Sequence, residues 1–216
     1  MQPSDGSVGT DRLTEFLASE HARLKLYLGV AAFTMVGRRY AAKYPIDTPN
    51  SRWFSRHLAK FLGETPPYSR NPELAELAKL EAALNAAFMA PEAPIWTARD
   101  LAELGIEDLA GSIILIHPSV QRLRFATNAT SLWAAMTCEQ TPPRPERLDE
   151  PSELVVWRQG PAARFRMLGE EEAHALDAAM AGNHEGISQG AVAYLPGWAE
   201  AQIISAVRKN RMTGKK

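Results

Sequence analysis

The spacing of apolar residues changes about halfway along the 216-residue chain, and this change limits the folds that the chain can adopt. Through the first half, apolar residues recur every three or four positions, the period of a helix with one buried face. From residue 112 the pattern changes to short β-branched runs, and between 163 and 167 arginines alternate with apolar residues, as in a half-buried strand. The chain is therefore predicted to be α+β and mostly α.

Four helices are predicted before this change, the last of them a short helix from Thr97 through Leu104. Residues 12–43 carry a long apolar stripe with an interruption at Gly29, and a second stripe ends at Gly63. The third helix has the clearest start, because Asn71 can cap its first N–H groups and Pro72 suits its first position. The first part of the chain is thus expected to form a helical domain.

The second half is predicted to contain a small sheet. Residues 112–116 form a β-branched run, and residues 119–126 could be a second extended piece before a helix at 127–136. Two further strands, 154–158 and 163–167, flank a Gln-Gly-Pro turn and are expected to pair as a hairpin. We expect the first run and the hairpin to form a three-stranded antiparallel sheet, accompanied by winged-helix-like helices.

Two domains are expected from these patterns. A helical domain would span residues 1–94, and an α+β domain of winged-helix or peptide-recognition type would span residues 95–216. Residues 141–152 hold four prolines among charged residues, which indicates an exposed linker loop. A last helix is expected from about Gly197 to Val207.

Composition limits the class of protein. The formal net charge of −1 gives no overall attraction to nucleic acid or to an anionic membrane. Cys138 is the one cysteine, so no internal disulfide forms and a reducing compartment fits. The first residues lack the apolar core of a signal peptide, and no apolar run approaches the roughly 18 residues that a membrane span requires. A cytoplasmic protein is expected.

No residue pattern predicts a catalytic or metal centre. The five histidines are scattered, without the His-x-x-x-His spacing that metal sites use. Glycine-rich phosphate loops and the Gly-x-Ser-x-Gly elbow do not occur in the sequence. Glu73, Glu76 and Glu81 lie on one predicted helix, where they would form a solvated face or, alternatively, a partner-contact face. We expect a protein that is not an enzyme, with no cofactor and no metal of its own.

A hairpin followed by helices also suggests a winged helix-turn-helix that binds DNA. Residues 153–216 hold eight basic and seven acidic residues, a net of +1. Proteins that bind duplex DNA usually place several phosphate-neutralising residues on one face. Here the basic residues lie on the hairpin and in the tail rather than within the final predicted helix, so DNA binding is the weaker hypothesis.

Five segments of the sequence form a recognisable series, within residues 28–45, 52–62, 72–94, 116–133 and 155–168. Taken in order, these segments resemble a bacterial family whose members carry a DNA-binding label and include the BufC/HvfC-type proteins. No single motif is specific, but the order and spacing of the segments are, and the likeness runs from about residue 13 to about residue 212. Such proteins often have a further helical segment with a Tyr-x-x-Asn element ahead of the matched region, which this sequence does not show.

The resemblance implies a non-catalytic partner subunit in a heterodimer. Members of this family are commonly encoded with, and bind, a TIM-barrel multinuclear non-haem iron oxidase. The oxidase would hold the iron and modify a small ribosomally made precursor peptide, while the partner recruits the leader of that peptide. A DNA-binding transcriptional regulator is the alternative.

The predicted hairpin offers a place for such a peptide. A sheet edge has unpaired backbone groups to which an extended peptide can add as one more strand. Arginines would suit an acidic leader, and aromatic residues could supply an apolar anchor. Alternatively, both aromatics are core residues and the arginines only keep the edge soluble. The candidate peptide-binding residues are Val155, Trp157, Arg158, Arg164, Phe165 and Arg166.

Overall fold

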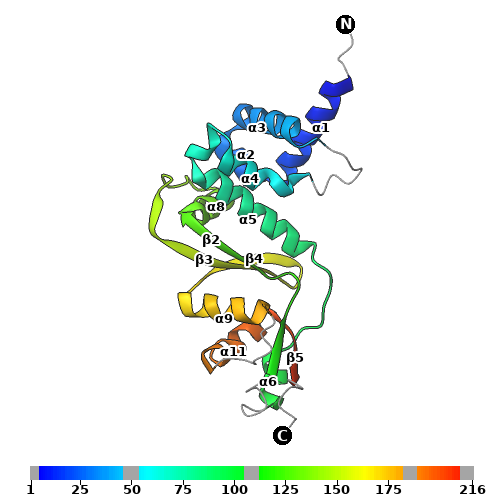
Figure 1. Cartoon of the computed structure of the whole chain (residues 1–216), viewed down its shortest axis with the longest axis vertical. Coiled ribbons are helices and arrows are strands. Elements are labelled where there is room, and N and C mark those ends of the chain that lie inside the picture. The colour runs from blue at the N-terminus through cyan, green and yellow to red at the C-terminus, as the bar shows by residue number, and fades with distance from the viewer. Residues whose placement is uncertain (1–4, 46–53, 105–111, 182–188, 210–216) are drawn as a thin grey trace. The chain divides into compact units, whose positions relative to one another are not determined.

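The computed structural model describes residues 5–45, 54–104, 112–181 and 189–209. Helices fill the described chain up to residue 104, and strands occur only from residue 112 onward (Figure 1). The predicted α+β class with a larger share of helix is confirmed. Among the described helices, none is long and apolar enough to cross a bilayer.

The helices of the first half follow the predicted stripes. The stripe over 12–43 is interrupted at Gly29, whose φ of 78° lies in the left-handed region, and again at His21. The helix predicted to begin at Pro72 begins there. The helices are α1 (Asp5–Glu20), α2 (Ala22–Leu28), α3 (Val30–Lys43), α4 (Leu58–Glu64), α5 (Pro72–Phe88) and α6 (Ala98–Leu104), with 3-10 turns at Ser55–His57 and Tyr68–Arg70.

The described strands form two separate sheets. One sheet has the order β2-β3-β4 and the other pairs β1 with β5. The elements of the second half are β1 (Ser112–Ile116), β2 (Gln121–Thr127), α8 (Ala129–Thr137), β3 (Arg147–Gln159), β4 (Ala162–Leu168), α9 (Glu170–Met180), α10 (Gln189–Val192), α11 (Leu195–Glu200) and β5 (Ile204–Lys209).

Two predictions about the sheet are wrong. Residues 112–116 do not join the hairpin, because β1 pairs antiparallel with β5 and the place beside β3 is taken by β2. The last helix does not run to Val207, because α11 ends at Glu200 and Gln202 has a φ of 61° that turns the chain. The buried β-branched pair Ile203 and Ile204 then starts an extended segment.

The predicted linker loop is only partly a loop. Residues 141–146 have no regular structure, but residues 147–152 are the first half of β3. Pro151 is tolerated there because the pairing of β3 with β4 begins only at Glu153.

The chain divides into two compact units, each made of two segments. Unit 1 comprises residues 1–85 and 125–151, and unit 2 comprises residues 86–124 and 152–216. These units differ from the domains predicted at 1–94 and 95–216, since β2 and β3 each contribute residues to both.

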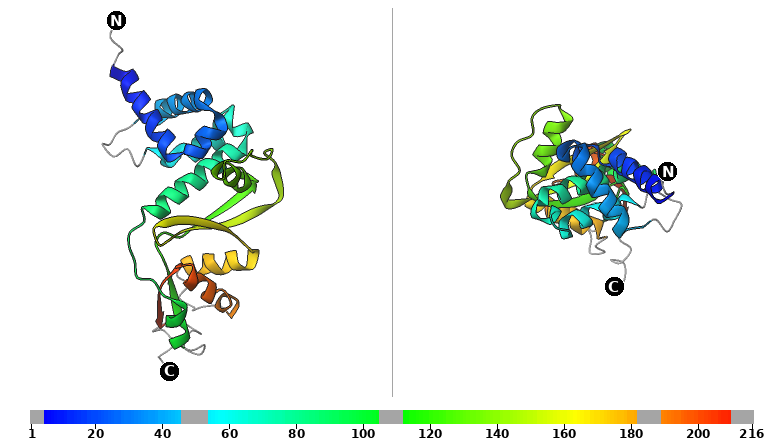
Figure 2. Two further views of the ribbon diagram at one scale, coloured as in Figure 1. Left: turned by 180° about the vertical axis from the view of Figure 1, so that it is seen from behind. Right: turned by 90° about the horizontal axis from the view of Figure 1, so that it is seen from above.

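Unit 1 has a helical core. Figure 2 shows α1 and α3 packed side by side, and their close approach depends on Gly37 of α3. A Cβ atom at that position would lie 2.7 Å from the side chain of Thr14 on α1, so a larger residue would force the helices apart. The largest fully buried side chains of this core are Leu17, Leu24, Phe33, Tyr40, Leu58, Phe61, Leu62, Leu77, Leu80, Phe125 and Leu132.

Unit 2 has its own apolar core between the hairpin and the C-terminal helices. Trp198 of α11 is fully buried there, together with Leu176 of α9. The same cluster contains Val155 and Trp157 of β3 and Leu168 of β4. One face of the hairpin therefore forms one side of this core.

Candidate functional site

The β3–β4 hairpin has a regular register that fixes the direction of every side chain and backbone group. Gln159 pairs with Ala162 around a two-residue Gly-Pro loop, and the pairing continues to Glu153 opposite Leu168. Gly160 has a φ of 58°, and Pro161 holds its own φ near −65°, a combination that suits a type II′ hairpin turn. The predicted hairpin is confirmed.

This register separates the hairpin side chains into two faces. Because neighbouring residues alternate, Arg164 and Arg166 lie on the face of Trp157 and Val155, their direct cross-strand partners. Phe165 lies on the opposite face.

Two of the predicted peptide-binding residues are core residues. Val155 is fully buried, and Trp157 is only 6% exposed. Both pack into the apolar cluster of unit 2. A docked peptide would not reach them, so the prediction of Trp157 as an apolar anchor is corrected.

The side chain of Arg158 binds groups within unit 2. Its guanidinium donates to the backbone carbonyls of Phe88 and Ala90, at 3.2 and 3.0 Å, and lies 2.9 Å from a carboxylate oxygen of Glu92. Its side chain is 12% exposed. Arg158 therefore fastens the segment after α5 to the hairpin and has little freedom to bind an acidic peptide.

Arg166 is neutralised by a carboxylate on the next helix. Its guanidinium donates through two nitrogens to Glu172 of α9, and the indole N–H of Trp198 donates to the same carboxylate at 2.8 Å. The hydrogen bond from Arg166, opposed by burial and helped by Trp198, lowers the pKa of Glu172. These three side chains join β4, α9 and α11. The role that the structure gives Arg166 is therefore to hold these elements together.

Arg164 and Met167 are the side chains of β4 that face solvent. Arg164 is exposed, and no carboxylate in the described part of unit 2 forms an ion pair with it. Met167 is 48% exposed, so its apolar side chain is open to solvent. Phe165 is half-buried beside them. Of the six predicted residues, Arg164 and Phe165 remain candidates, and the sequence pattern did not single out Met167.

The outer edge of β4 offers backbone groups for a further strand. In a hairpin with a two-residue loop, the pair that flanks the loop is hydrogen-bonded, and bonded and non-bonded pairs alternate from there. Arg164 and Arg166 therefore direct their backbone N–H and C=O groups toward β3. The backbone groups of Ala163 and Met167 point away from β3, to the side where the described sheet ends.

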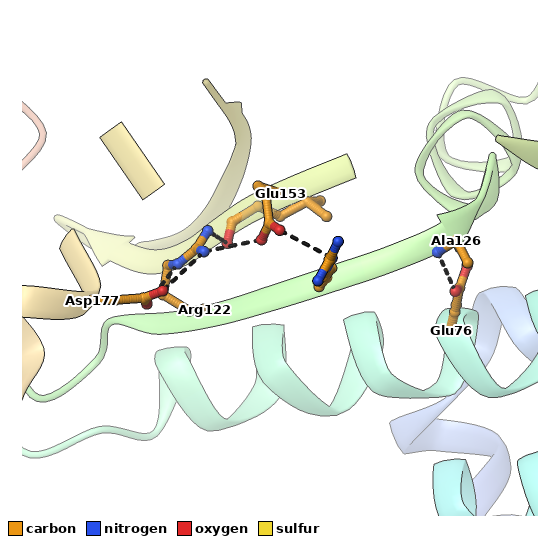
Figure 3. A network of polar contacts seen from close by, with 7 residues as sticks. Glu76, Arg122, Ala126, Glu153 and Asp177 are labelled. Atoms are coloured by element: carbon orange, nitrogen blue, oxygen red, sulfur yellow. Dashed lines mark hydrogen bonds and ion pairs between the residues drawn. The ribbon is translucent and has the colours of Figure 1, made fainter. Parts of the chain in front are cut away.

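Other strand edges are at least partly occupied. At the end of β2, the backbone N–H of Ala126 donates to the carboxylate of Glu76 at 2.6 Å (Figure 3). The backbone N–H of Thr127 donates to the same carboxylate at 3.1 Å. In the second sheet, the carbonyl of Ile204 in β5 accepts the N–H of Trp96. Helix α9 packs against β1. Edge β4 is thus the best candidate for adding a strand.

An ion-pair network supports the start of the hairpin in unit 2. The guanidinium of Arg122 on β2 lies 2.9 Å from Glu153 on β3 and 2.9 Å from Asp177 on α9 (Figure 3). Arg124 reaches the other carboxylate oxygen of Glu153 at 3.1 Å. No local pattern predicted this network, because Arg122 is 31 positions from Glu153 and 55 positions from Asp177, and these residues meet only through the fold.

His117 and Ser119 form a buried polar pair that sequence analysis also missed. The ring Nδ1 accepts the backbone N–H of Ser119 at 3.2 Å and lies 2.8 Å from its hydroxyl, which accepts the N–H of Arg158. Burial, and then the charge of Arg158, lower the pKa of His117, opposed by Glu92. Serine and histidine in contact can begin an acyl transfer, but here both are almost fully buried. The pair fastens the turn after β1 to β3.

The glutamates of α5 are not a solvated face. Glu73 and Glu81 are buried, and Glu76 binds the end of β2. Glu81 accepts the backbone N–H groups of Arg23 and Leu24, at 2.7 and 3.0 Å, and so caps α2 from another helix. Within the described residues, no group of three or more His, Cys, Asp and Glu side chains is placed to hold a metal ion.

No family model matches the chain, and no curated protein matches it. The resemblance in the order of the sequence segments therefore stays a prediction.

Proposed function

We propose that this protein is a non-catalytic, peptide-binding partner subunit. It would hold the leader of a small ribosomally made precursor peptide as an added strand on the outer edge of β4. The observation that carries this proposal is the end of the described sheet at β4, where the backbone groups of Ala163 and Met167 point outward beside two exposed side chains. Strand addition of this kind gives affinity through backbone bonds and specificity through alternate side chains.

The expected affinity is modest. About three backbone hydrogen bonds, at a net of about 0.5–1.5 kcal/mol each, supply a few kcal/mol. Micromolar binding requires about 8 kcal/mol, so side-chain contacts with Arg164, Phe165 and Met167 must supply much of the rest. The ordering of a flexible peptide opposes both, and we expect dissociation constants in the micromolar range or weaker.

The second part of the proposal concerns the enzyme partner. The ordered resemblance to BufC/HvfC-type proteins supports a TIM-barrel multinuclear non-haem iron oxidase that holds the iron and performs the modification. The protein would then act by bringing peptide and oxidase together in one cytoplasmic complex. Its own residues would bind and orient the peptide backbone.

A DNA-binding regulator is the alternative function. The hairpin gives it little support, because Arg158 and Arg166 are paired with Glu92 and Glu172. Phosphate contacts would release counterions, so DNA affinity should fall steeply with added salt. A mobility shift at low salt with fragments of its own genomic locus, lost as salt is raised, would favour this alternative.

A pair of variants at Met167 tests the peptide-binding function. Proline at this position removes an outward N–H, while leucine keeps it and retains a similar apolar side chain. We expect the affinity of the proline variant for the precursor peptide to fall at least about tenfold. This is roughly the free energy of one lost backbone hydrogen bond together with the weakening of the bonds next to it. The leucine variant should bind within about twofold of the unmodified protein.

The controls separate binding from folding and from the oxidase. Circular dichroism must show both Met167 variants folded, and size-exclusion chromatography with the neighbouring oxidase reports the other contact. Equal peptide affinity of the two folded variants would remove β4 as the docking edge. Separate elution of protein and oxidase at micromolar concentrations would count against the partner-subunit part of the proposal.

A further inference from the structure

The side chains along β4 differ in charge and polarity. The residues of a strand added beside β4 must complement the side chain next to each of them. Arg164 lies on one face with its charge exposed, and Arg166 lies on the same face with its charge neutralised by Glu172. Phe165 and Met167 lie on the other face. A strand added at the outer edge places one residue beside each of these positions, alternating between the two faces.

Phe165 and Met167 are the large apolar side chains of β4 on the second face of the hairpin. Phe165 is half-buried and Met167 is 48% exposed. An apolar peptide residue beside them would cover this surface, whereas a polar residue placed there would lose contact with water.

We infer that the peptide segment accepted at β4 has the pattern apolar–acidic–apolar–neutral–apolar across residues 163–167. This inference rests on the proposed function, and it names the chemistry of the segment that the same edge accepts. The acidic residue pairs with Arg164. The apolar residues lie on the face of Phe165 and Met167.

The peptide residue beside Arg166 is expected to be neutral, although Arg166 is a cation. An acidic residue beside Arg166 would meet a guanidinium whose two nitrogens already bind Glu172, with the carboxylate also bonded to Trp198. The added carboxylate would gain little attraction and would be repelled by Glu172. One acidic residue should therefore bind better than two, although a simple count of arginines on β4 predicts the opposite.

Synthetic peptides of about ten residues provide the test. The reference peptide carries Val-Glu-Val-Ser-Val between glycine and serine flanks, a second replaces Glu by Lys, and a third carries Val-Glu-Val-Glu-Val. Titration calorimetry or fluorescence anisotropy with the whole protein should rank the reference first. A partly exposed charge pair predicts a loss of about three- to tenfold for the Lys peptide. The third peptide should bind no better than the reference.

A charge exchange identifies Arg164 as the residue that recognises the acid. Arg164→Glu should weaken the reference peptide and bind the Lys peptide within about twofold of the original complex. Lys79→Glu is the matched control, since it makes the same charge change at an exposed position of α5 in unit 1. Equal effects of the two substitutions, or failure of the exchange to restore binding, would overturn the inference.

The outcomes also separate the inference from the function on which it rests. If the protein binds its own precursor peptide but shows no preference among the three synthetic peptides, the pattern is wrong and strand addition stands. If the synthetic reference does not bind while the precursor does, the pattern is likewise wrong. If neither binds, the proposed function itself is wrong.

Discussion

His21 and Glu81, buried side by side in unit 1, give a prediction that is independent of any partner. The side chain of His21 is almost completely buried, and neither ring nitrogen has a hydrogen-bond partner in the described structure. Its Nδ1 lies 3.9 Å from Glu81, which is longer than a hydrogen bond. Burial lowers the pKa of His21 to about 4. Burial, opposed by the N–H groups of Arg23 and Leu24, raises the pKa of Glu81 to about 7.

These two shifts have opposite effects on stability as the pH changes. Between pH 4.5 and 7, Glu81 holds its proton in the folded state but not in the unfolded state. The stability that Glu81 contributes is therefore fully present below pH 4.5 and is lost as the pH rises to about 7. Between pH 6.5 and 4, His21 is protonated in the unfolded state but not in the folded state. The stability that His21 contributes is therefore fully present above pH 6.5 and is lost as the pH falls to about 4. Each shift corresponds to about 3 kcal/mol. Between pH 4.5 and 6.5 the two contributions should nearly cancel.

Single substitutions should reveal each contribution. Relative to the unmodified protein, Glu81→Gln should lose about 3 kcal/mol of unfolding free energy as the pH falls from 7 to 4.5, because only the His21 effect remains. His21→Gln should gain about the same amount over that range, because only the Glu81 effect remains. Urea denaturation of the three proteins at several pH values measures these differences, and groups common to all three cancel.

The reasoning would be refuted by a difference that does not depend on pH for either variant. An independent check is the ring resonance of His21 in a nuclear magnetic resonance titration. The account predicts a neutral ring at pH 6, where an ordinary histidine is largely protonated. A protonated ring at that pH would show that His21 and Glu81 form a charged pair instead.

Two further predictions concern the hairpin. Trp157→Ala should destabilise the fold by about 3–5 kcal/mol in urea denaturation, because it empties a buried site, whereas Arg164→Ala should change stability by less than about 0.5 kcal/mol; similar costs for both would contradict their assignment to core and surface. Glu172→Gln should release the charge of Arg166 and remove the disadvantage of a second acidic residue, so that the Val-Glu-Val-Glu-Val peptide then binds at least as tightly as the reference; an unchanged ranking would show that Arg166 is not the reason for it.

Local sequence signals predicted the elements whose determinants are close together in the chain. Asn71 and Pro72 predicted the start of α5, and the Gly-Pro loop with alternating residues predicted the pairing of β3 with β4. In each case the residues that fix the backbone lie within a few positions of the element itself.

Long-range pairings were not predictable in the same way. Strand β5 pairs with β1 across about 90 intervening residues, and the spacing of Trp198, Ile203, Ile204 and Val207 suits a helix as well as a strand. Similarly, a glutamate on a helix has the same sequence pattern whether it is solvated or caps another helix. Glu81 could be identified as the cap of α2 only once the two helices were seen together.

The sequence pattern also did not show which of the predicted peptide-binding residues are buried and which are exposed. Period-two alternation shows which residues share a face of the hairpin, but it does not show which face is covered. In the structure, α9 and α11 cover the face that carries Trp157, so this residue joins the core. Glu172 comes with α9 and neutralises Arg166, which leaves Arg164 as the exposed cation of the strand.

Amide hydrogen exchange with and without the precursor peptide can detect an added strand residue by residue. If the peptide adds as a strand to the outer edge of β4, the outward N–H groups of Ala163 and Met167 should exchange more slowly in the complex. The N–H of Arg164, already directed toward β3, should change much less. Protection at Ala163 and Met167 in this alternating pattern is the predicted result. Saturating peptide binding with unchanged exchange at both residues would contradict the account.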